Sequence, residues 1–96
     1  MRPFEALELH RDRIREIALR HRVSDVRVFG SASRGEDTES SDLDLLVEPT
    51  AETTLFDLGA IRLEVRALLG VDIDVLTPNA LPDSCRSRVI DEAVPL

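Results

Sequence analysis

The stretch VFGSASRGEDTESSDLDLL, residues 28–46, decides the fold that we predict for this chain. It begins with apolar residues typical of a strand, turns at Gly30 and Ser31, and crosses a polar loop. It then enters an apolar run that holds Asp42 and Asp44. Ionised carboxylates are costly to bury, so two of them inside an apolar strand need a partner that compensates their charge. The stretch therefore predicts two strands with a chemical site beside them.

Strand alternation determines where these carboxylates point. Residues 42–49, DLDLLVEP, are predicted to form a strand closed by a proline, and the period of two places Asp42 and Asp44 on one face. Leu43 and Leu45 then point into the core. A third strand is predicted from residue 71, where VDIDVLT again places two aspartates on one face.

The remaining segments predict helices around a small sheet. Residues 4–21 show helical spacing of apolar side chains, Thr53 or Thr54 caps a second helix that ends at Gly70, and a last helical stretch includes Val94. A turn at residues 24–25 precedes the strand VRVF, residues 26–29. The order helix, strand, turn, strand, helix, strand, helix predicts an α/β (α+β) fold. We expect one domain over residues 1–96, with helices packed on a small mixed sheet of three or slightly more strands.

Composition narrows the class of function. The chain has 96 residues and a net charge of −7, which argues against a surface that binds nucleic acid directly. No apolar run has the length of a membrane span or of a signal peptide core, so we expect a cytoplasmic protein. All twelve basic residues are arginine, so a bound phosphate must be held by backbone amides, arginine or metal.

The clustered aspartates require compensation of their charge. Two carboxylates about 4 Å apart repel by roughly 4 kcal/mol at an effective dielectric constant near 20. Protonation of one carboxylate, divalent cations, or side chains that point outward into water would each relieve this repulsion. Hard oxygen ligands such as these suit Mg²⁺ or Mn²⁺, which complete their coordination with water and substrate phosphates.

The residues upstream of the aspartates suggest an anion site. Gly30 and Ser31 stand at the start of a predicted helical turn over residues 31–35, and the free amides of such a turn attract phosphate. The same residues would also serve as an ordinary strand-to-helix turn. A phosphate cradle and a metal site would then share one edge of the sheet.

The combined motif resembles that of a known family. GSASRGEDTESSDLDLLV, residues 30–47, matches the nucleotidyltransferase signature of Gly-Ser, ten residues and Asp-x-Asp. The chain is similar to minimal nucleotidyltransferases, the MNT group of the DNA polymerase beta superfamily, also in VDIDVLTPNAL and IDEAVPL, residues 71–81 and 90–96. The resemblance implies a nucleotidyltransferase fold, two Mg²⁺ ions (or Mn²⁺), and a nucleoside triphosphate such as ATP. It also implies an antitoxin role beside a HEPN-type ribonuclease toxin, with AMP transferred to a tyrosine.

Roles for single residues follow from the resemblance. Asp42 and Asp44 correspond to the metal-bridging pair, and Asp74 to the third catalytic and metal-binding carboxylate, which helps to deprotonate the attacking hydroxyl. Asp72 shares a face with Asp74 and is the alternative third carboxylate, disfavoured because only Asp74 precedes VLTP. Gly30 would let the backbone approach the triphosphate, and Ser31 would contact the β- or γ-phosphate.

Two further residues are candidates for nucleotide binding. Arg34 would contact phosphate or the partner, or else pair with Glu36 or Asp37. Ser41 would take a direct part in nucleotide binding, or would simply form the turn before the aspartates.

Three functions fit the sequence. The first is an adenylyltransferase that modifies a partner toxin, and the second is an acidic antitoxin that neutralises the toxin by binding alone. The third is a small-molecule nucleotidyltransferase completed by dimerisation. Nucleotide-dependent covalent transfer would discriminate between the first two functions, and the oligomeric state stays open.

Overall fold

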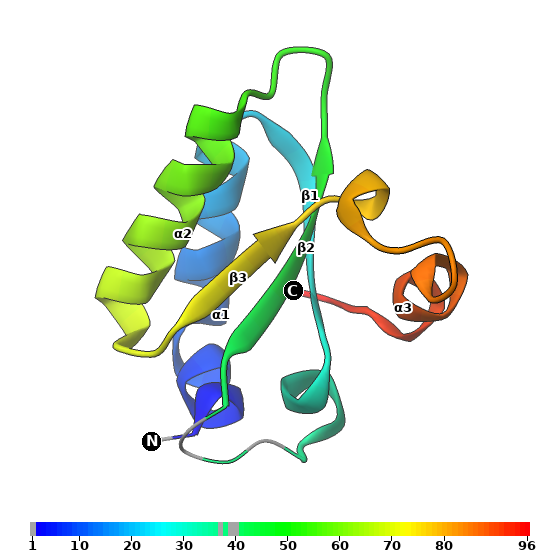
Figure 1. Ribbon diagram of the computed structural model, residues 1–96. Helices are drawn as coiled ribbons and strands as arrows, with labels where there is room; N and C mark the ends of the chain where they lie inside the picture. Colours follow the sequence, from blue (N-terminus) through cyan, green and yellow to red (C-terminus); the bar gives the residue numbers. More distant parts are fainter. Residues whose placement is uncertain (1, 37, 39–40) are drawn as a thin grey trace.

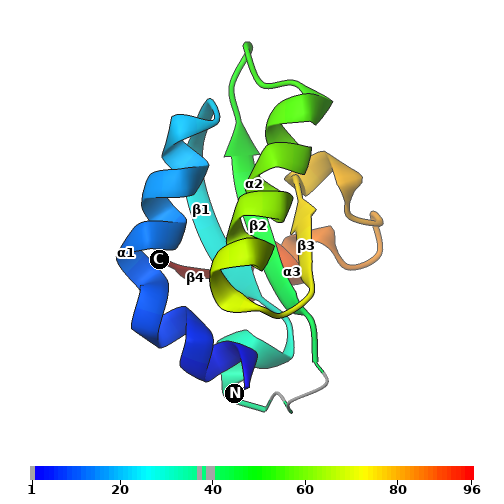
Figure 2. The same ribbon diagram turned by 90° about the vertical axis from the view of Figure 1, so that its left-hand side faces the viewer.

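The protein has three layers in the computed structural model, which describes residues 2–36, 38 and 41–96. Helices α1 (Pro3–Arg20) and α2 (Leu55–Leu69) pack side by side on one face of a β-sheet, and the short α3 (Arg86–Glu92) covers part of the other face (Figure 1 and Figure 2). Two 3₁₀ turns, η1 (Ser31–Arg34) and η2 (Pro78–Ala80), lie in the connections. Within these described ranges, no helix is long and apolar enough to cross a membrane.

The sheet has four strands in the order β3-β2-β1-β4. The central strands β1 (Val23–Phe29) and β2 (Leu43–Pro49) are antiparallel, and β3 (Ile73–Leu76) is parallel to β2. The short β4 (Val94–Pro95) pairs antiparallel with β1. The α+β class with a small mixed sheet is confirmed.

Both faces of β2 are used for packing, and they differ in polarity. Leu43, Leu45 and Val47 are fully buried in the main core between the sheet and the helices α1 and α2. On the opposite face, Leu46 packs with Leu81 and Ala93 in a smaller cluster beneath α3. The prediction that Leu43 and Leu45 point into the core is confirmed. The opposite face of β2, which carries Asp44, is covered only in part, by the smaller cluster beneath α3.

The ends of α2 follow the sequence signals closely. Thr54 caps the helix by accepting a hydrogen bond from the backbone N–H of Asp57, and the Asp57 carboxylate bonds back to Thr54 N–H at 2.8 Å. Gly70 ends the helix in the left-handed conformation, with φ of 71°. Both predicted ends are therefore confirmed.

The start of β1 differs from the prediction. Residues 24–25 were predicted to form a turn, but they lie inside β1, and the turn is formed by His21 and Arg22 with Arg22 at a φ of 66°. An irregularity in the pairing of β1 with β2 between Val23 and Asp25 interrupts the alternation of buried residues. Because of this irregularity, the first residues of β1 do not show the period-two pattern of a strand, and the sequence predicted a turn there.

The end of the chain also differs. Val94 was predicted to extend the last helix, yet α3 ends at Glu92 and Val94 pairs with Val28 in β4. The physical reason is the following Pro95, because a proline disfavours helical geometry at the residue before it. Val94 is therefore extended and forms a fourth strand.

Candidate functional site

Three aspartates lie on the sheet face that points away from α1 and α2. In β2, Asp44 alternates with the buried Leu43 and Leu45, so its side chain emerges on the side of α3. In the parallel register of β2 and β3, Asp44 is the direct partner of Asp74. Asp42 precedes β2 and is close enough to raise the pKa of Asp44. The structure thus pairs Asp44 with Asp74 and places Asp42 within electrostatic reach of Asp44.

Asp44 and Asp74 interact as a pair. Burial, the charge of Asp74 and the charge of Asp42, in that order, raise the pKa of Asp44 from 3.8 to about 6, and a hydrogen bond to the Asp74 side chain adds to the rise. With this pKa, Asp44 is largely protonated below about pH 6 and largely ionised at neutral pH, where its charge is unfavourable beside Asp74.

The Gly30 turn packs directly against Asp44. Phe29, at the end of β1, is opposite Asp44 in the antiparallel ladder, and Gly30 follows with a φ of +78°. A Cβ atom added to Gly30 would lie 2.5 Å from Asp44 Oδ2, which is closer than any stable contact. Only glycine therefore lets the turn approach the carboxylate at this distance.

Ser31 opens η1 directly after Gly30, as predicted for a helical turn at this position. The turn is closed by Ser33, whose N–H and hydroxyl donate to the Gly30 carbonyl at 3.2 and 2.7 Å. The backbone N–H groups at the start of η1 therefore come directly after Gly30, the residue that packs against Asp44. This is the arrangement expected of a phosphate cradle beside a carboxylate site.

The two secondary candidates are placed differently. Arg34 forms an ion pair with Glu36 at 3.1 Å and also lines a pocket with Gly30. The alternative partner named for it, Asp37, lies outside the described residues. The hydroxyl of Ser41 accepts a hydrogen bond from the N–H of Thr38 at 2.9 Å. A local bond of this kind is typical of a residue that forms a turn.

Asp72 takes a separate position from the pair. Its side chain is exposed, and its Oδ1 atom lies 3.5 Å from Nη2 of Arg66 on α2. Its backbone carbonyl accepts a hydrogen bond from Leu43 N–H at 2.9 Å, which aligns β3 with β2. Asp74 is thus the partner of Asp44 in the sheet, whereas the Asp72 carboxylate pairs with the Arg66 guanidinium.

The chemistry of the pair suits a divalent cation. In the described part of the chain, no three Asp, Glu, His or Cys side chains converge as a complete metal centre. The Asp44 and Asp74 carboxylates nevertheless supply hard oxygen donors, and the pKa of Asp44 is raised by burial and by the neighbouring carboxylate charges, both of which a bound cation would offset. The donor set fits Mg²⁺ or Mn²⁺ completed by water and phosphate oxygens.

A pocket of about 540 Å³ extends from the Gly30 turn to α3. Its walls include Arg88 and Glu92, which lie one helical turn apart, together with Gly30 and Arg34. Neither Arg88 nor Glu92 belongs to the motif that predicted the site. The available signal was an arginine and an acid four residues apart on a mostly polar helix, and this pattern also fits an ordinary exposed face.

Comparison with known proteins assigns the family. A family model described as a nucleotidyltransferase domain matches residues 7–96. The chain belongs to the nucleotidyltransferase family. A relative from Methanocaldococcus jannaschii, named as a candidate protein adenylyltransferase, is 40% identical over 78 residues, which are 81% of this chain and 84% of the relative. This nucleotidyltransferase therefore has the enzyme class that its motif indicated.

Solved structures agree with the fold. The structure of a candidate minimal nucleotidyltransferase has a TM-score of 0.87 and 41% identity, and the match covers 97% of this nucleotidyltransferase and 95% of that chain. A chain in a crystal structure of a toxin–antitoxin complex with AMP-PNP has a TM-score of 0.74 at 16% identity, covering 88% of this chain and 69% of that one. The second likeness is one of fold alone.

Proposed function

We propose that this nucleotidyltransferase is the antitoxin of a toxin–antitoxin pair and that it transfers AMP from ATP to a hydroxyl of its toxin partner. The observation that carries the proposal is the pairing of Asp44 with Asp74 across neighbouring strands, with Gly30 packed against Asp44. This arrangement joins a pair of carboxylates to a turn whose amides suit phosphate. Transfer of a nucleotidyl group requires both features, because carboxylates hold the metal ions and backbone amides bind the phosphates.

The phosphates of the nucleotide would lie along the Gly30 turn. The reactive α-phosphorus belongs beside Asp44 and Asp74, and the β- and γ-phosphates beside Gly30 and the N–H of Ser31. Arg34 lines the same pocket and can add a positive charge when it leaves Glu36. Ser41, which is hydrogen-bonded to Thr38, would shape the turn before Asp42.

The carboxylates would perform the transfer step. Asp74 accepts the proton of the attacking hydroxyl, whose oxygen forms a bond to the α-phosphorus of ATP. The bond between that phosphorus and the oxygen bridging to the β-phosphate breaks, so pyrophosphate leaves with the electron pair. The products are an AMP ester of the hydroxyl, pyrophosphate and the proton held by Asp74.

Asp42, Asp44 and Asp74 are the residues that would hold Mg²⁺, or Mn²⁺ in its place. When bound, up to two such ions neutralise the negative charge that develops on the phosphate oxygens. The protein's part is to hold the carboxylates on rigid strands, where their positions are determined by the pairing of β2 with β3.

The nature of the acceptor rests on relatives and fold neighbours. The relative at 40% identity is named for adenylylation of proteins, which supports a protein hydroxyl as the acceptor. The neighbour in a toxin–antitoxin complex with AMP-PNP supports a toxin partner and an adenine nucleotide. The motif resemblance adds the finer proposal of a HEPN-type ribonuclease toxin modified on tyrosine.

The test is a transfer assay with matched variants. Purified partner toxin, ATP and Mg²⁺ are mixed with the wild type, with Asp74→Asn or with Asp72→Asn, and the intact mass of the toxin is measured. We expect AMP-sized mass increments with the wild type and with Asp72→Asn, and a loss of at least a hundredfold in rate with Asp74→Asn, because asparagine cannot accept the proton. All three forms should co-elute with the toxin.

Two results would contradict the proposal. Equal losses in Asp72→Asn and Asp74→Asn would show that the choice between these carboxylates is wrong. If the wild type protects cells from the toxin without adding mass, and Asp74→Asn protects equally well, neutralisation is by binding alone.

A further inference from the structure

The negative charge of a nucleoside triphosphate requires positively charged groups in the protein, which the aspartates cannot supply. A nucleoside triphosphate carries several negative charges, and this chain has a net charge of −7 with arginine as its sole basic residue type apart from two histidines. The pocket beside the Gly30 turn is also lined by the acidic residue Glu92. Arginine side chains at this pocket would therefore add to the backbone amides of the Gly30 turn in holding the phosphates on the side remote from the metal ligands.

Most arginines of the described structure are already engaged. Eight of the twelve form an ion pair or a hydrogen bond to a backbone carbonyl, namely Arg2, Arg11, Arg20, Arg27, Arg34, Arg62, Arg66 and Arg86. Within the described ranges the other four, Arg13, Arg15, Arg22 and Arg88, have no such partner. Of these four, Arg88 lines the pocket that contains Gly30 and Arg34.

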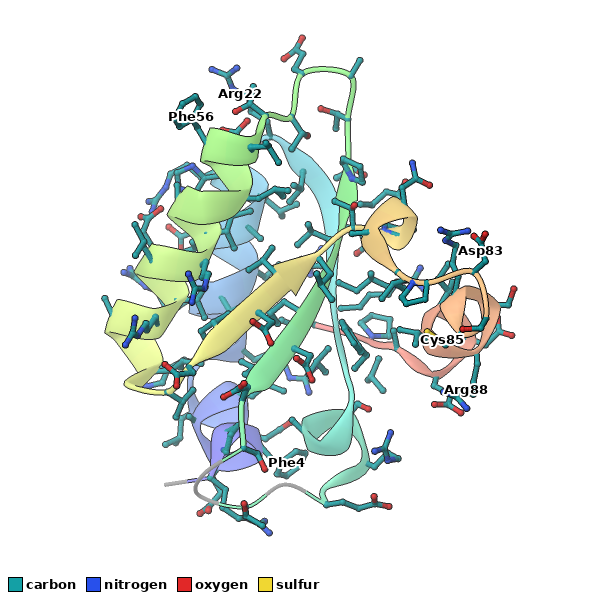
Figure 3. All side chains as sticks on the ribbon, in the orientation of Figure 1. Phe4, Arg22, Phe56, Asp83, Cys85 and Arg88 are labelled. Atoms are coloured by element: carbon teal, nitrogen blue, oxygen red, sulfur yellow. The ribbon has the colours of Figure 1, made fainter. Side chains whose placement is uncertain are left out.

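The position of Arg88 is held by its neighbour two residues earlier. Arg86 donates from Nε to the Pro78 carbonyl at 2.8 Å and from Nη2 to the Leu81 carbonyl at 2.7 Å, and it pairs with Asp83. These bonds hold the start of α3 on the η2 turn. Figure 3 shows Arg88 below α3, on the side of the helix nearer to η1.

We propose that Arg88 binds the β- and γ-phosphates of the nucleotide and that Arg86 positions it. The assignment rests on the proposed function, because the α-phosphorus must lie at Asp44 and Asp74. Gly30 packs against Asp44 and also lines the pocket of Arg88, so phosphates that follow the α-phosphorus along the Gly30 turn would enter this pocket. Among the residues that the structure describes, Arg88 has no ion pair that phosphate would have to displace.

Binding measurements test this with a matched control. Calorimetric titration of the full chain with a non-hydrolysable ATP analogue and Mg²⁺ compares the wild type, Arg88→Gln and Arg13→Gln. Both substitutions remove one positive charge that lacks a partner in the described structure, but Arg13 lies on α1, on the far face of the sheet. We expect Arg88→Gln to weaken binding by at least tenfold and Arg13→Gln by less than twofold. Arg88→Lys should fall between the wild type and Arg88→Gln.

Titration with AMP distinguishes the phosphates. Because AMP lacks the β- and γ-phosphates, its affinity should be the same within twofold for the wild type and Arg88→Gln. Arg86→Lys should weaken binding of the triphosphate in the wild-type background and have no further effect in the Arg88→Gln background. Additive losses would show that Arg86 acts independently of Arg88.

The outcomes separate the two proposals. If the wild type binds the triphosphate and Arg88→Gln binds it as tightly as Arg13→Gln, the role of Arg88 is wrong while the proposed function stands. Equal losses for the triphosphate and AMP would also overturn the assignment to the β- and γ-phosphates. Failure of the wild type to bind any adenine nucleotide with Mg²⁺ would overturn the proposed function, and the Arg88 assignment with it.

Discussion

The Asp44 carboxylate occupies a position that costs the fold stability at neutral pH. Its pKa of about 6 in the folded protein lies above the ordinary value of 3.8, so the folded state binds its proton more tightly than the unfolded state. The stabilising contribution of this proton is fully present below about pH 4 and is lost as the pH rises through 6. A site that must hold a cation is therefore unfavourable in its empty, ionised state.

We predict that Asp44→Asn is more stable than the wild type at pH 8 without divalent metal, and that the difference shrinks toward pH 4. Asparagine keeps the shape of the side chain without its charge. The expected gain is about 1 to 2 kcal/mol, after allowance for the water that reaches this half-buried carboxylate. Urea denaturation in the presence of a chelator at the two pH values measures it, and a gain that is larger at pH 4 than at pH 8 would contradict the argument.

Gly30 permits a second prediction, with Gly35 as its control. Both glycines have a positive φ, but an added Cβ would meet Asp44 at position 30 and no atom within 4 Å at position 35. Gly35→Ala should cost about 1 kcal/mol, the conformational cost alone, whereas Gly30→Ala should cost about 2 to 4 kcal/mol because overpacking is added. In an Asp44→Ala background, the two costs measured by denaturation should become equal, and a persisting difference would place the strain elsewhere.

Helix α2 combines a buried face with an exposed apolar one. Ile61 is fully buried in the main core, while Phe56, near the start of the helix, is 90% exposed and points outward (Figure 3). Its capping interactions and the terminal Gly70 define its length, but the stability of the helix comes from the buried face.

We predict opposite sensitivities for these two positions. Ile61→Ala should lower the free energy of unfolding by about 2 to 5 kcal/mol, since it removes buried methyl groups and leaves a cavity. Phe56→Ala should change it by less than about 0.5 kcal/mol. Chemical denaturation of both variants gives the comparison, and a large loss for Phe56→Ala would mean that this ring is covered in the folded protein.

For the molecule as a whole, ligand binding should offset the cost of the carboxylate site. Mg²⁺ relieves the repulsion between the aspartates, and the triphosphate brings oxygen ligands for the ion, so each favours binding of the other. At concentrations about a hundredfold above the dissociation constant, the pair should stabilise the fold by about 2.7 kcal/mol. Thermal unfolding with both ligands should show a larger rise in Tm than the sum of the rises with each ligand alone. A Tm that both ligands together leave unchanged would contradict a working site.

Local signals in the sequence were sufficient for much of this protein. The alternation around Asp42 and Asp44, the Gly30–Ser31 turn, and the ends of α2 at Thr54 and Gly70 each depend on a few adjacent residues. Sequence patterns report such features because backbone geometry and side-chain periodicity are local properties. The fold class and the residues of the Gly-Ser and Asp-x-Asp motif could therefore be predicted from the sequence alone.

Tertiary structure decided which distant residues meet. The parallel register of β2 and β3 makes Asp74 the partner of Asp44, while Arg66 on α2 engages Asp72. Arg88 lines the same pocket as Gly30 only because α3 folds back over the sheet, where Arg86 bonds its start to the Pro78 carbonyl. Strand register and helix placement are determined by packing between segments far apart in the chain, so no local pattern encodes them.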